Sequence, residues 1–248
     1  DKTVGIVLVH VLGFNAINNE IVKFCKDNDL FLIEDCCEAH GATYKTRKSG
    51  SFGDVSNFSF YFGHHITTIE GGMVCTNDDE LFEYAKLFRS HGMTREASES
   101  TQEKYKKNYP DLNPLFTFAV PGYNVRNQEL NAVLGRQQLK RLNFNVEKRA
   151  ENFNTWLSNL DSDKYYIDFQ REGNSNFALP LIVEKNNLVL FKKVCKFLVE
   201  KDVEFRVGTA GGGSQARQPY LEQYDFVTHE LTNMDYIHEY GLYIGNHP

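Results

Sequence analysis

The sequence lacks the features of a nucleic-acid-binding or membrane protein. Its 27 Lys and Arg residues against 33 Asp and Glu give a formal net charge of −6. This balance gives no sign of the basic surface that binding to nucleic acid or an acidic membrane requires. No apolar run approaches the roughly 20 residues that span a bilayer, and the N-terminus lacks the basic-then-apolar pattern of a signal peptide. We expect a cytoplasmic protein with no nucleic-acid or membrane partner.

Cysteine is also scarce, and its spacing excludes the common cysteine frameworks. The sequence has five cysteines, no Cys-x-x-Cys pair, and two adjacent thiols, Cys36 and Cys37, that cannot close an ordinary bridge. We therefore expect a reducing compartment, with neither a zinc site nor an iron–sulfur cluster. The chain opens at Asp1 without an initiator Met, which predicts a fragment whose N-terminal portion is missing.

Short apolar runs alternate with helical patterns in the first part of the chain. Residues 4–10 predict a strand buried on both faces, and a helix capped by Asn15 follows. Residues 30–33 predict a second buried strand that ends at Asp35. This βαβ pattern places Asp35 at the carboxyl end of a strand, where ligands collect in such sheets.

The rest of the chain completes an α/β pattern. We expect a large domain over 1–142 and a small C-terminal α+β domain over 143–248. The further expected elements are strands at 55–61 and 73–76, a helix from 77 to near Gly92, an exposed polar excursion at 94–115, a helical stretch after Arg126 with a break near 143–145 that reaches 160, a strand at 177–183, a helix at 188–201 and a strand at 203–207.

Three islands of sequence, taken together and in order, resemble one family. They cover residues 33–42, 59–72 and 122–126. The pattern resembles the DegT-type family of sugar aminotransferases and dehydratases, which use pyridoxal phosphate. The resemblance implies the fold-type I (aspartate aminotransferase-like) fold: a mixed, mostly parallel sheet with helices on both faces and a smaller C-terminal α+β domain. It also implies a homodimer with shared active sites.

The cofactor-binding residues are expected in these islands. A carboxylate at the position of Asp35 can pair with the protonated pyridine nitrogen, although an isolated Asp there could also be a helix cap or a surface acid. By resemblance, Glu38 lies near the phenolic oxygen, where most relatives carry Gln; it could also be an exposed acid. Ser59 would hold the cofactor phosphate, and Asn124 would reach the phosphate of the neighbouring subunit.

His64 is the expected catalytic residue. By resemblance, the position six residues before Glu70 is the Schiff-base lysine of the aminotransferases, and this sequence has no lysine between Lys48 and Lys86. Imidazole cannot form the imine, but with an unperturbed pKa of about 6.5 it can take and give protons. We expect non-covalent pyridoxal or pyridoxamine phosphate, with L-glutamate as amine donor. A His-His pair in a turn could otherwise be a surface feature.

The resemblance then implies dehydration in place of amino transfer. The expected reaction removes the C3 hydroxyl of a nucleotide-linked 4-keto-6-deoxyhexose, GDP-4-keto-6-deoxy-D-mannose, in deoxysugar (O-antigen and lipopolysaccharide) biosynthesis. Three alternatives stay open: a CDP-4-keto-6-deoxyglucose 3-dehydratase, which carries an iron–sulfur cluster; an ordinary aminotransferase, which the absent lysine disfavours; and a relative without catalysis.

Other residues carry weaker expectations. His91 follows a predicted helix and could approach an active site, whereas His40 and His65 are expected either to support residues that contact the ligand or to be structural. The glycine-rich residues 208–219 lack the Gly-Lys-Ser/Thr ending of a P-loop. Arg206 and Arg217, at this loop, could bind the nucleotide diphosphate, because the forked donors of arginine suit phosphate oxygens.

Overall fold

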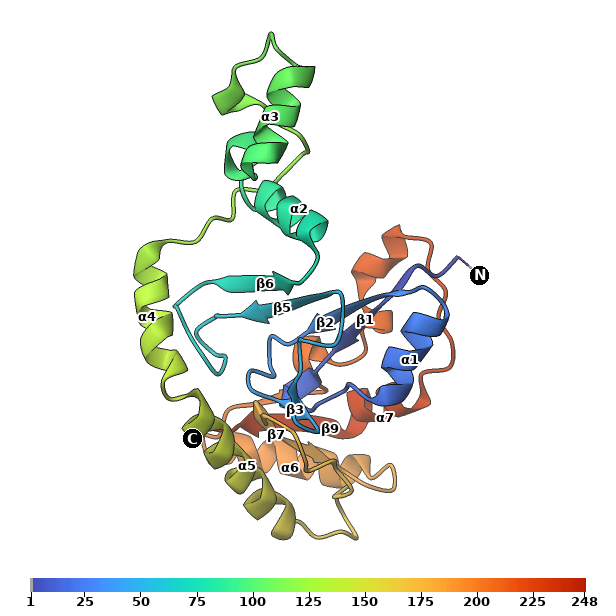
Figure 1. Cartoon of the computed structure of the whole chain (residues 1–248). Coiled ribbons are helices and arrows are strands. Elements are labelled where there is room, and N and C mark those ends of the chain that lie inside the picture. The colour runs from blue at the N-terminus through green and yellow to red at the C-terminus, as the bar shows by residue number, and fades with distance from the viewer. Residues whose placement is uncertain (1) are drawn as a thin grey trace. The chain divides into compact units, whose positions relative to one another are not determined.

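Strands and helices alternate along the chain (Figure 1). The computed structural model describes residues 2–248. Its strands are β1 (Gly5–Val9), β2 (Phe31–Asp35), β3 (Thr43–Tyr44), β4 (Arg47–Lys48), β5 (Val55–Ser59), β6 (Gly72–Thr76), β7 (Ala178–Ile182), β8 (Phe205–Val207) and β9 (Gly241–Gly245). Its α-helices are α1 (Asn19–Asp27), α2 (Asp79–Arg89), α3 (Glu99–Asn108), α4 (Glu129–Leu139), α5 (Leu142–Ser158), α6 (Leu188–Glu200) and α7 (Thr232–Tyr240). Short 3₁₀ segments include η1 (Val11–Gly13) and η3 (Pro114–Phe116).

The chain divides into two compact units. The first unit comprises residues 1–8, 19–35 and 50–139, and the second comprises 9–18, 36–49 and 140–248. Two short N-terminal segments thus belong with the C-terminal part of the chain. The domain boundary at 142/143 stays a prediction.

The first unit is built on a four-stranded sheet in the order β1-β2-β5-β6. β2 pairs with β5 in parallel, with Asp35 opposite Asn57, and β5 pairs with β6 antiparallel, with Ser59 opposite Gly72. Because side chains alternate between the two faces of a strand, Asp35, Asn57 and Ser59 leave the same face of the sheet. Glu34 leaves the other face.

Glu34 fixes the turn that leads into β5. Its side chain is fully buried, and its carboxylate accepts hydrogen bonds from the backbone N–H groups of Gly50 (2.8 Å), Phe52 (2.7 Å) and Gly53 (2.7 Å). A buried carboxylate with this many donors has its desolvation offset, and it satisfies amides that have no strand partner. The start of β5 is therefore held by β2 through a side chain as well as through the sheet.

Two local predictions were wrong at the start of the chain. Val7 and Val9 of β1 are 64% and 46% exposed, so β1 is not buried on both faces; within residues 2–248 it lies at the edge of its sheet. Asn15 does not cap α1, which begins only at Asn19. Its side-chain oxygen instead accepts from the N–H of Ile17 at 3.2 Å, a local turn that competes with helix formation.

The middle of the chain shows one agreement and one difference. The polar residues 94–115 are mostly exposed, as predicted, and they contain a helix, α3, whose start is capped by the Ser98 hydroxyl as it accepts from the N–H of Thr101. The helical stretch breaks after Leu139, where α4 ends, and not at 143–145; α5 begins at Leu142. The expected strands and helices elsewhere are present within a few residues of their predicted ends.

The second unit has its own sheet and core. Its strands run in the order β7-β9-β8, and both pairs are antiparallel. The buried core consists of Leu181, Val183, Phe191 and Leu242, against which the α5 and α6 side chains Trp156 and Val194 pack. This arrangement agrees with the α+β character predicted for the C-terminal part. Among residues 2–248, no helix combines the length and the apolar character needed to cross a bilayer.

Candidate active site

Asp35 is held at the carboxyl end of β2 by its neighbour on β5. The Asn57 side-chain amide donates to one carboxylate oxygen of Asp35 over 3.0 Å, between Nδ2 and Oδ1. Both side chains are half-buried. The pair presents a fixed carboxylate at the edge where ligands bind in open α/β sheets.

Ser59 lies two residues beyond Asn57 on the same strand. Its hydroxyl oxygen accepts from the N–H of Tyr61 at 3.2 Å, where the chain leaves β5. Its partner across the sheet is Gly72, so no side chain crowds the hydroxyl from β6. A half-buried hydroxyl here can still donate its own proton to a phosphate oxygen.

His64 lies on the turn that follows β5. Its backbone N–H donates to the carbonyl of Tyr61 at 3.0 Å, and the two rings meet edge-on with centroids 5.6 Å apart. Backbone hydrogen bonds from Phe60 to Gly71 (2.8 Å) and from Thr68 to Phe60 (2.9 Å) close this loop. The imidazole therefore sits on an ordered turn next to the strand that carries Ser59.

The surroundings of His64 favour the neutral imidazole. Burial lowers its pKa below the ordinary value of 6.5, which outweighs two opposing influences: a hydrogen bond to the Ser59 carbonyl and the nearby negative charge of Asp35. A neutral, half-buried imidazole near a carboxylate is suited to accept a proton close to neutral pH.

The segment that carries Asn124 is clamped by the end of α2. The N–H of Tyr123 donates to the Phe88 carbonyl at 2.7 Å, and that of His91 donates to the Tyr123 carbonyl at 2.6 Å. Gly92 has φ +77, and a Cβ there would meet the Val120 carbonyl oxygen at 1.8 Å. Asn124 is exposed on this segment, and His91 belongs to the clamp through its backbone.

The remaining predicted site residues belong to the second unit and lie in different surroundings. The Glu38 carboxylate accepts from the N–H of Leu12 at 2.7 Å. Arg206 forms a 3.6 Å ion pair with Glu204, and both side chains are largely exposed. The Arg217 guanidinium pairs with Asp235 at 2.8 Å and Glu239 at 3.3 Å.

The histidines predicted to be structural, His40 and His65, are both buried. The backbone carbonyl of His40 accepts from the Ser175 hydroxyl at 2.7 Å. The roles of His40 and His65 stay predictions.

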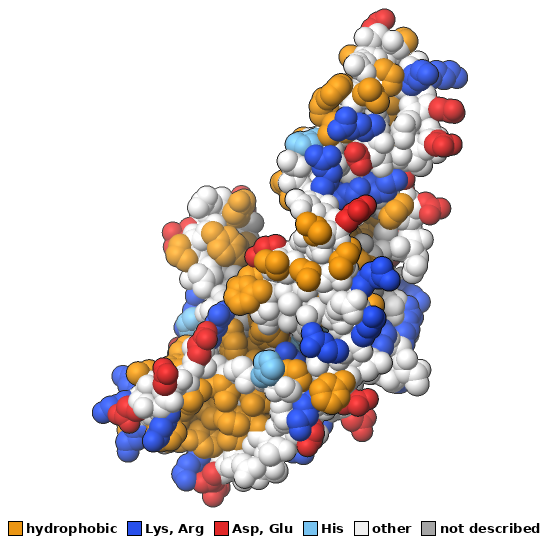
Figure 2. All heavy atoms as spheres, turned by 90° about the vertical axis from the view of Figure 1, so that its left-hand side faces the viewer, with side chains coloured by type: hydrophobic (Ala, Val, Ile, Leu, Met, Phe, Trp, Pro, Cys, Tyr) orange, Lys and Arg blue, Asp and Glu red, His pale blue; other side chains and the backbone are white. Residues whose placement is uncertain are grey.

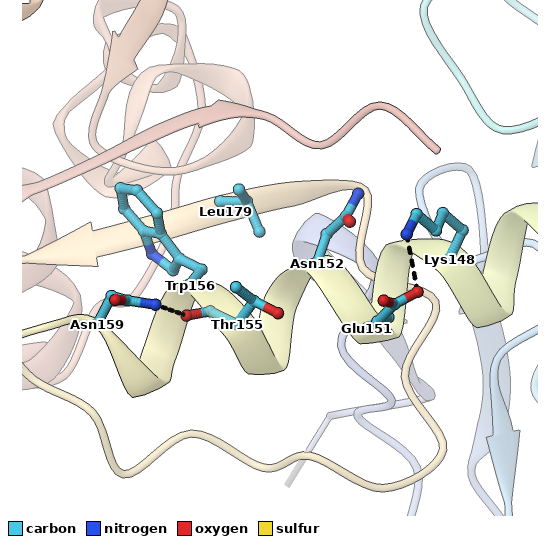
Figure 3. A pocket seen from close by; sticks show the side chains of 7 residues that line it. All are labelled: Lys148, Glu151, Asn152, Thr155, Trp156, Asn159 and Leu179. Atoms are coloured by element: carbon cyan, nitrogen blue, oxygen red, sulfur yellow. Dashed lines mark hydrogen bonds and ion pairs between the residues drawn. The ribbon is translucent and has the colours of Figure 1, made fainter.

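A separate open groove of about 450 Å³ lies along α5 and β7 of the second unit (Figure 3). Inside it, Lys148 pairs with Glu151 at 2.8 Å, and the Asn159 amide donates to the Thr155 carbonyl at 2.8 Å. None of the predicted site residues lines it. Its lining residues are Lys148, Glu151, Asn152, Thr155, Trp156, Asn159 and Leu179.

The sequence pattern did not identify Asn57. A short polar residue in a strand carries little information alone. The available indication was its position two residues before Ser59, on the face predicted to hold a ligand. Only the β2–β5 register shows that it is the partner of Asp35.

The groups gathered in the first unit suit a pyridine ring that bears a phosphate. Asp35 offers an anion for a ring N–H, Ser59 offers a hydroxyl for phosphate, and His64 offers a proton acceptor. The chain has no lysine between residues 48 and 86, so nothing in this stretch can hold an aldehyde as an imine.

The whole chain matches a known family model. The description of that family is the DegT/DnrJ/EryC1/StrS aminotransferase family, and the match covers residues 1–248. The GDP-4-keto-6-deoxy-D-mannose 3-dehydratase of Yersinia pseudotuberculosis is 35% identical over 250 residues, which is 100% of this chain and 63% of that enzyme. The chain thus spans slightly less than two thirds of this relative.

Solved structures show the same likeness. The Escherichia coli GDP-4-keto-6-deoxy-D-mannose-3-dehydratase with bound hydrated PLP matches with a TM-score of 0.86 and 30% identity, over 100% of this chain and 64% of that one. A GDP-4-keto-6-deoxymannose-3-dehydratase with a trapped PLP-glutamate geminal diamine matches with a TM-score of 0.84 and 30% identity, over 100% and 64%. These neighbours confirm the predicted PLP-dependent aminotransferase fold.

Proposed function

Because the chain belongs to the DegT/DnrJ/EryC1/StrS aminotransferase family, we propose that it acts as a pyridoxamine-phosphate-dependent sugar 3-dehydratase. Its substrate is GDP-4-keto-6-deoxy-D-mannose, and the reaction removes the C3 hydroxyl in deoxysugar biosynthesis. The observation that carries the proposal is His64, a half-buried imidazole next to Ser59 and Asp35 in a stretch without lysine. The likeness of all 248 residues to part of named 3-dehydratases supports it.

Asp35, Ser59 and Glu38 hold the cofactor in this proposal. Asp35 pairs with the ring nitrogen and keeps the ring cationic, and the Ser59 hydroxyl donates to the phosphate. Glu38, whose carboxylate accepts from the N–H of Leu12, lies near the phenolic oxygen, where a carboxylate needs a proton or a nearby cation to avoid repulsion. When bound, pyridoxamine phosphate supplies a primary amine for the sugar ketone and a ring that withdraws electrons.

His64 moves the proton. The neutral imidazole takes a proton from the C4′ carbon and afterwards serves as a general acid. Burial supports this role because it keeps the ring unprotonated at neutral pH. Since no lysine follows β5 before residue 86, no amine of this stretch competes for the cofactor carbon, and elimination takes the place of amino transfer.

L-Glutamate restores the amine form of the cofactor in this proposal. A solved relative carries a PLP-glutamate adduct, which supports glutamate as the donor. Each turnover thus consumes one glutamate if the product sugar leaves as a ketone and ammonia is released.

The proposal includes a homodimer with shared sites. Asn124 lies on an exposed segment and reaches the phosphate of the neighbouring subunit. The same stretch exposes large apolar side chains, and Figure 2 shows hydrophobic side chains at the surface of the face that it draws. Exposed apolar patches of this kind mark interaction surfaces. The exposed apolar side chains of this stretch include Tyr123, Val125, Leu130, Val133 and Leu134.

The substrate nucleotide and the cellular location belong to the same proposal. Arg206 and Arg217 contact the diphosphate, and His91 approaches the sugar. The protein works in the cytoplasm, where nucleotide sugars and glutamate are available. The CDP-linked alternative requires an iron–sulfur cluster, and the sequence has no group of cysteines after the helix that ends near Gly92, which argues against it.

The decisive experiment compares the protein with its His64→Asn variant. Both are incubated with pyridoxamine phosphate, L-glutamate and GDP-4-keto-6-deoxy-D-mannose, and the products are identified by mass spectrometry. We expect a 3-deoxy sugar from the unmodified protein and a loss of about 10²–10⁴-fold in the variant, the usual contribution of a positioned acid–base group. Borohydride should not attach the cofactor to the chain.

Matched assays separate the alternatives. His65→Asn changes the buried neighbour of His64 and should retain turnover. The CDP-linked sugar and iron analysis test the related dehydratase, and a stable amino sugar would indicate an aminotransferase. Unchanged turnover in His64→Asn would refute the proposed mechanism.

A further inference from the structure

We propose that Asn57 is a positioning residue that fixes the Asp35 carboxylate for the ring nitrogen of the cofactor. The inference rests on the proposed function, because that function requires the cofactor. It starts from one contact: Asn57 Nδ2 donates to Asp35 Oδ1 at 3.0 Å, and both side chains are half-buried.

The sheet makes this contact rigid. Asp35 and Asn57 are direct register partners on the parallel strands β2 and β5, so their side chains leave the sheet side by side. Asp35 ends β2, which is paired with β5. Asn57 lies in β5, which is also paired with β6 along its whole length. A carboxylate that is bonded to an adjacent strand loses rotational freedom before a ligand arrives, which lowers the entropic cost of pairing with it.

The chemistry of the amide is suited to this role. A neutral N–H donor stabilises an ionised carboxylate without cancelling its charge. A Lys or Arg at the same position would form an ion pair with Asp35 and compete with the ring nitrogen. Asn57 therefore orients Asp35 and leaves the charge available for the cofactor.

Residues of one strand, β5, then act on both the ring end and the phosphate end of the cofactor. Asn57 and Ser59 are two residues apart on the same face of β5, about 7 Å along the strand. Asn57 acts on the ring end through Asp35, and Ser59 acts on the phosphate end. A disturbance at Asn57 should affect the ring nitrogen more than the phosphate.

The test uses two variants and a matched control. Asn57→Leu replaces the amide donor by an apolar side chain of similar size. Asn57→Asp keeps the shape of the side chain but places a second carboxylate beside Asp35. Ser56→Ala is the control, because it removes a hydrogen bond of the same strand, from the Ser56 hydroxyl to the Gly50 carbonyl at 2.7 Å, on the opposite face. Pyridoxamine phosphate affinity is measured by equilibrium dialysis, and ¹⁵N NMR of ring-labelled cofactor reports the protonation of the ring nitrogen.

We expect Asn57→Leu to weaken cofactor binding about tenfold, because an Asp35 carboxylate that is no longer fixed must be ordered when the ring binds, and to move the ring-nitrogen resonance toward the neutral form. Asn57→Asp should bind more weakly still. Ser56→Ala should lower the melting temperature and leave the ring resonance in place. If Asn57→Leu does not fold, Asn57→Asp against Ser56→Ala gives the same comparison.

Two results would contradict the positioning role of Asn57, and a third would contradict the proposed function. An unchanged ring resonance and affinity in both Asn57 variants overturns the positioning role. An equal change in Ser56→Ala overturns it too, because the effect would then be a general loosening of β5. No cofactor binding by the unmodified protein would instead refute the proposed function itself.

Discussion

The polar groups on β2 and β5 of the first unit and the two arginines of the second unit are held in different ways. Asp35 and Ser59 are half-buried, and a backbone or amide contact fixes each of them. Arg206, on β8, and Arg217 are exposed and already paired with carboxylates. The half-buried groups are thus organised before a ligand binds, whereas the exposed arginines must exchange partners to bind one. The predictions below test this contrast.

The largest difference should separate two carboxylates of the same motif. We expect Asp35→Asn to lower kcat by about 10²–10³-fold, because the ring nitrogen loses its charged partner in a half-buried site. We expect Glu38→Gln, in the second unit, to cost about tenfold or less, because an amide oxygen can still accept from the N–H of Leu12.

Steady-state rates at saturating cofactor check this pair. The cofactor dissociation constant, measured separately, shows whether each effect arises in binding or in turnover. Equal losses in the two variants would remove the distinction between the pre-organised strand carboxylate and the other acid of the motif.

Gly92 tests whether the clamp on the Asn124 segment depends on backbone geometry. Gly92→Ala should lower the free energy of unfolding by at least about 2 kcal/mol, because φ is +77 and the new Cβ would lie 1.8 Å from the Val120 carbonyl oxygen. Gly245→Ala is the control, since a Cβ there meets nothing within 4 Å. Urea unfolding of both variants gives the two values; a loss in Gly92→Ala no greater than in the control would contradict the clamp.

The strand-borne part of the site could be predicted from sequence because strands impose a fixed spacing. Once residues 30–35 and 55–61 are taken as neighbouring strands, Asp35 and Ser59 must lie near the same edge, and they do. The Asn57 contact could not be predicted, since it depends on register, and one residue of slip would turn the side chain to the other face.

The errors came from tertiary context. The apolar residues of β1 indicated burial on both faces, but burial depends on what covers the strand and not on its composition. Asn15 resembled a helix cap, yet its side chain bonds locally to Ile17 and the helix starts later. The surroundings of Arg217 had no sequence indication, because its partners lie on α7, 18 and 22 residues further along the chain.

The two arginines offer a smaller effect within the second region. If both contact the diphosphate, Arg206→Gln should raise KM for the sugar nucleotide about tenfold, because its 3.6 Å pair with an exposed Glu204 is weak and easily exchanged. Arg217→Gln should raise KM only about twofold, because Asp235 and Glu239 already hold its guanidinium and would have to release it. Initial rates over a range of substrate concentrations decide the order, and the reverse order would mean that pairing with carboxylates does not limit these two arginines.

The smallest effect should be a change in the titration of His64. Burial lowers its pKa below 6.5, while the charge of Asp35 acts in the opposite direction. Neutralising that charge by Asp35→Asn should therefore lower the pKa of His64 further, which NMR of the imidazole C–H resonances can follow.

In the unmodified protein, the neutral form of His64 is the base, so activity should fall only as pH drops below 6.5 through the folded-state pKa.

The lowered pKa of His64 also makes the free energy of unfolding depend on pH. The unfolded chain binds a proton at His64 at a higher pH than the folded chain does, so the free energy of unfolding falls as pH decreases from about 6.5 and levels off below the folded-state pKa. His64→Asn should remove this component of the acid dependence, and urea unfolding across that pH range measures it. If the His64 resonances titrate at or above 6.5, the imidazole is not held neutral by burial. The contrast between the half-buried site of the first unit and the exposed arginines of the second would then no longer extend to the residue that moves the proton.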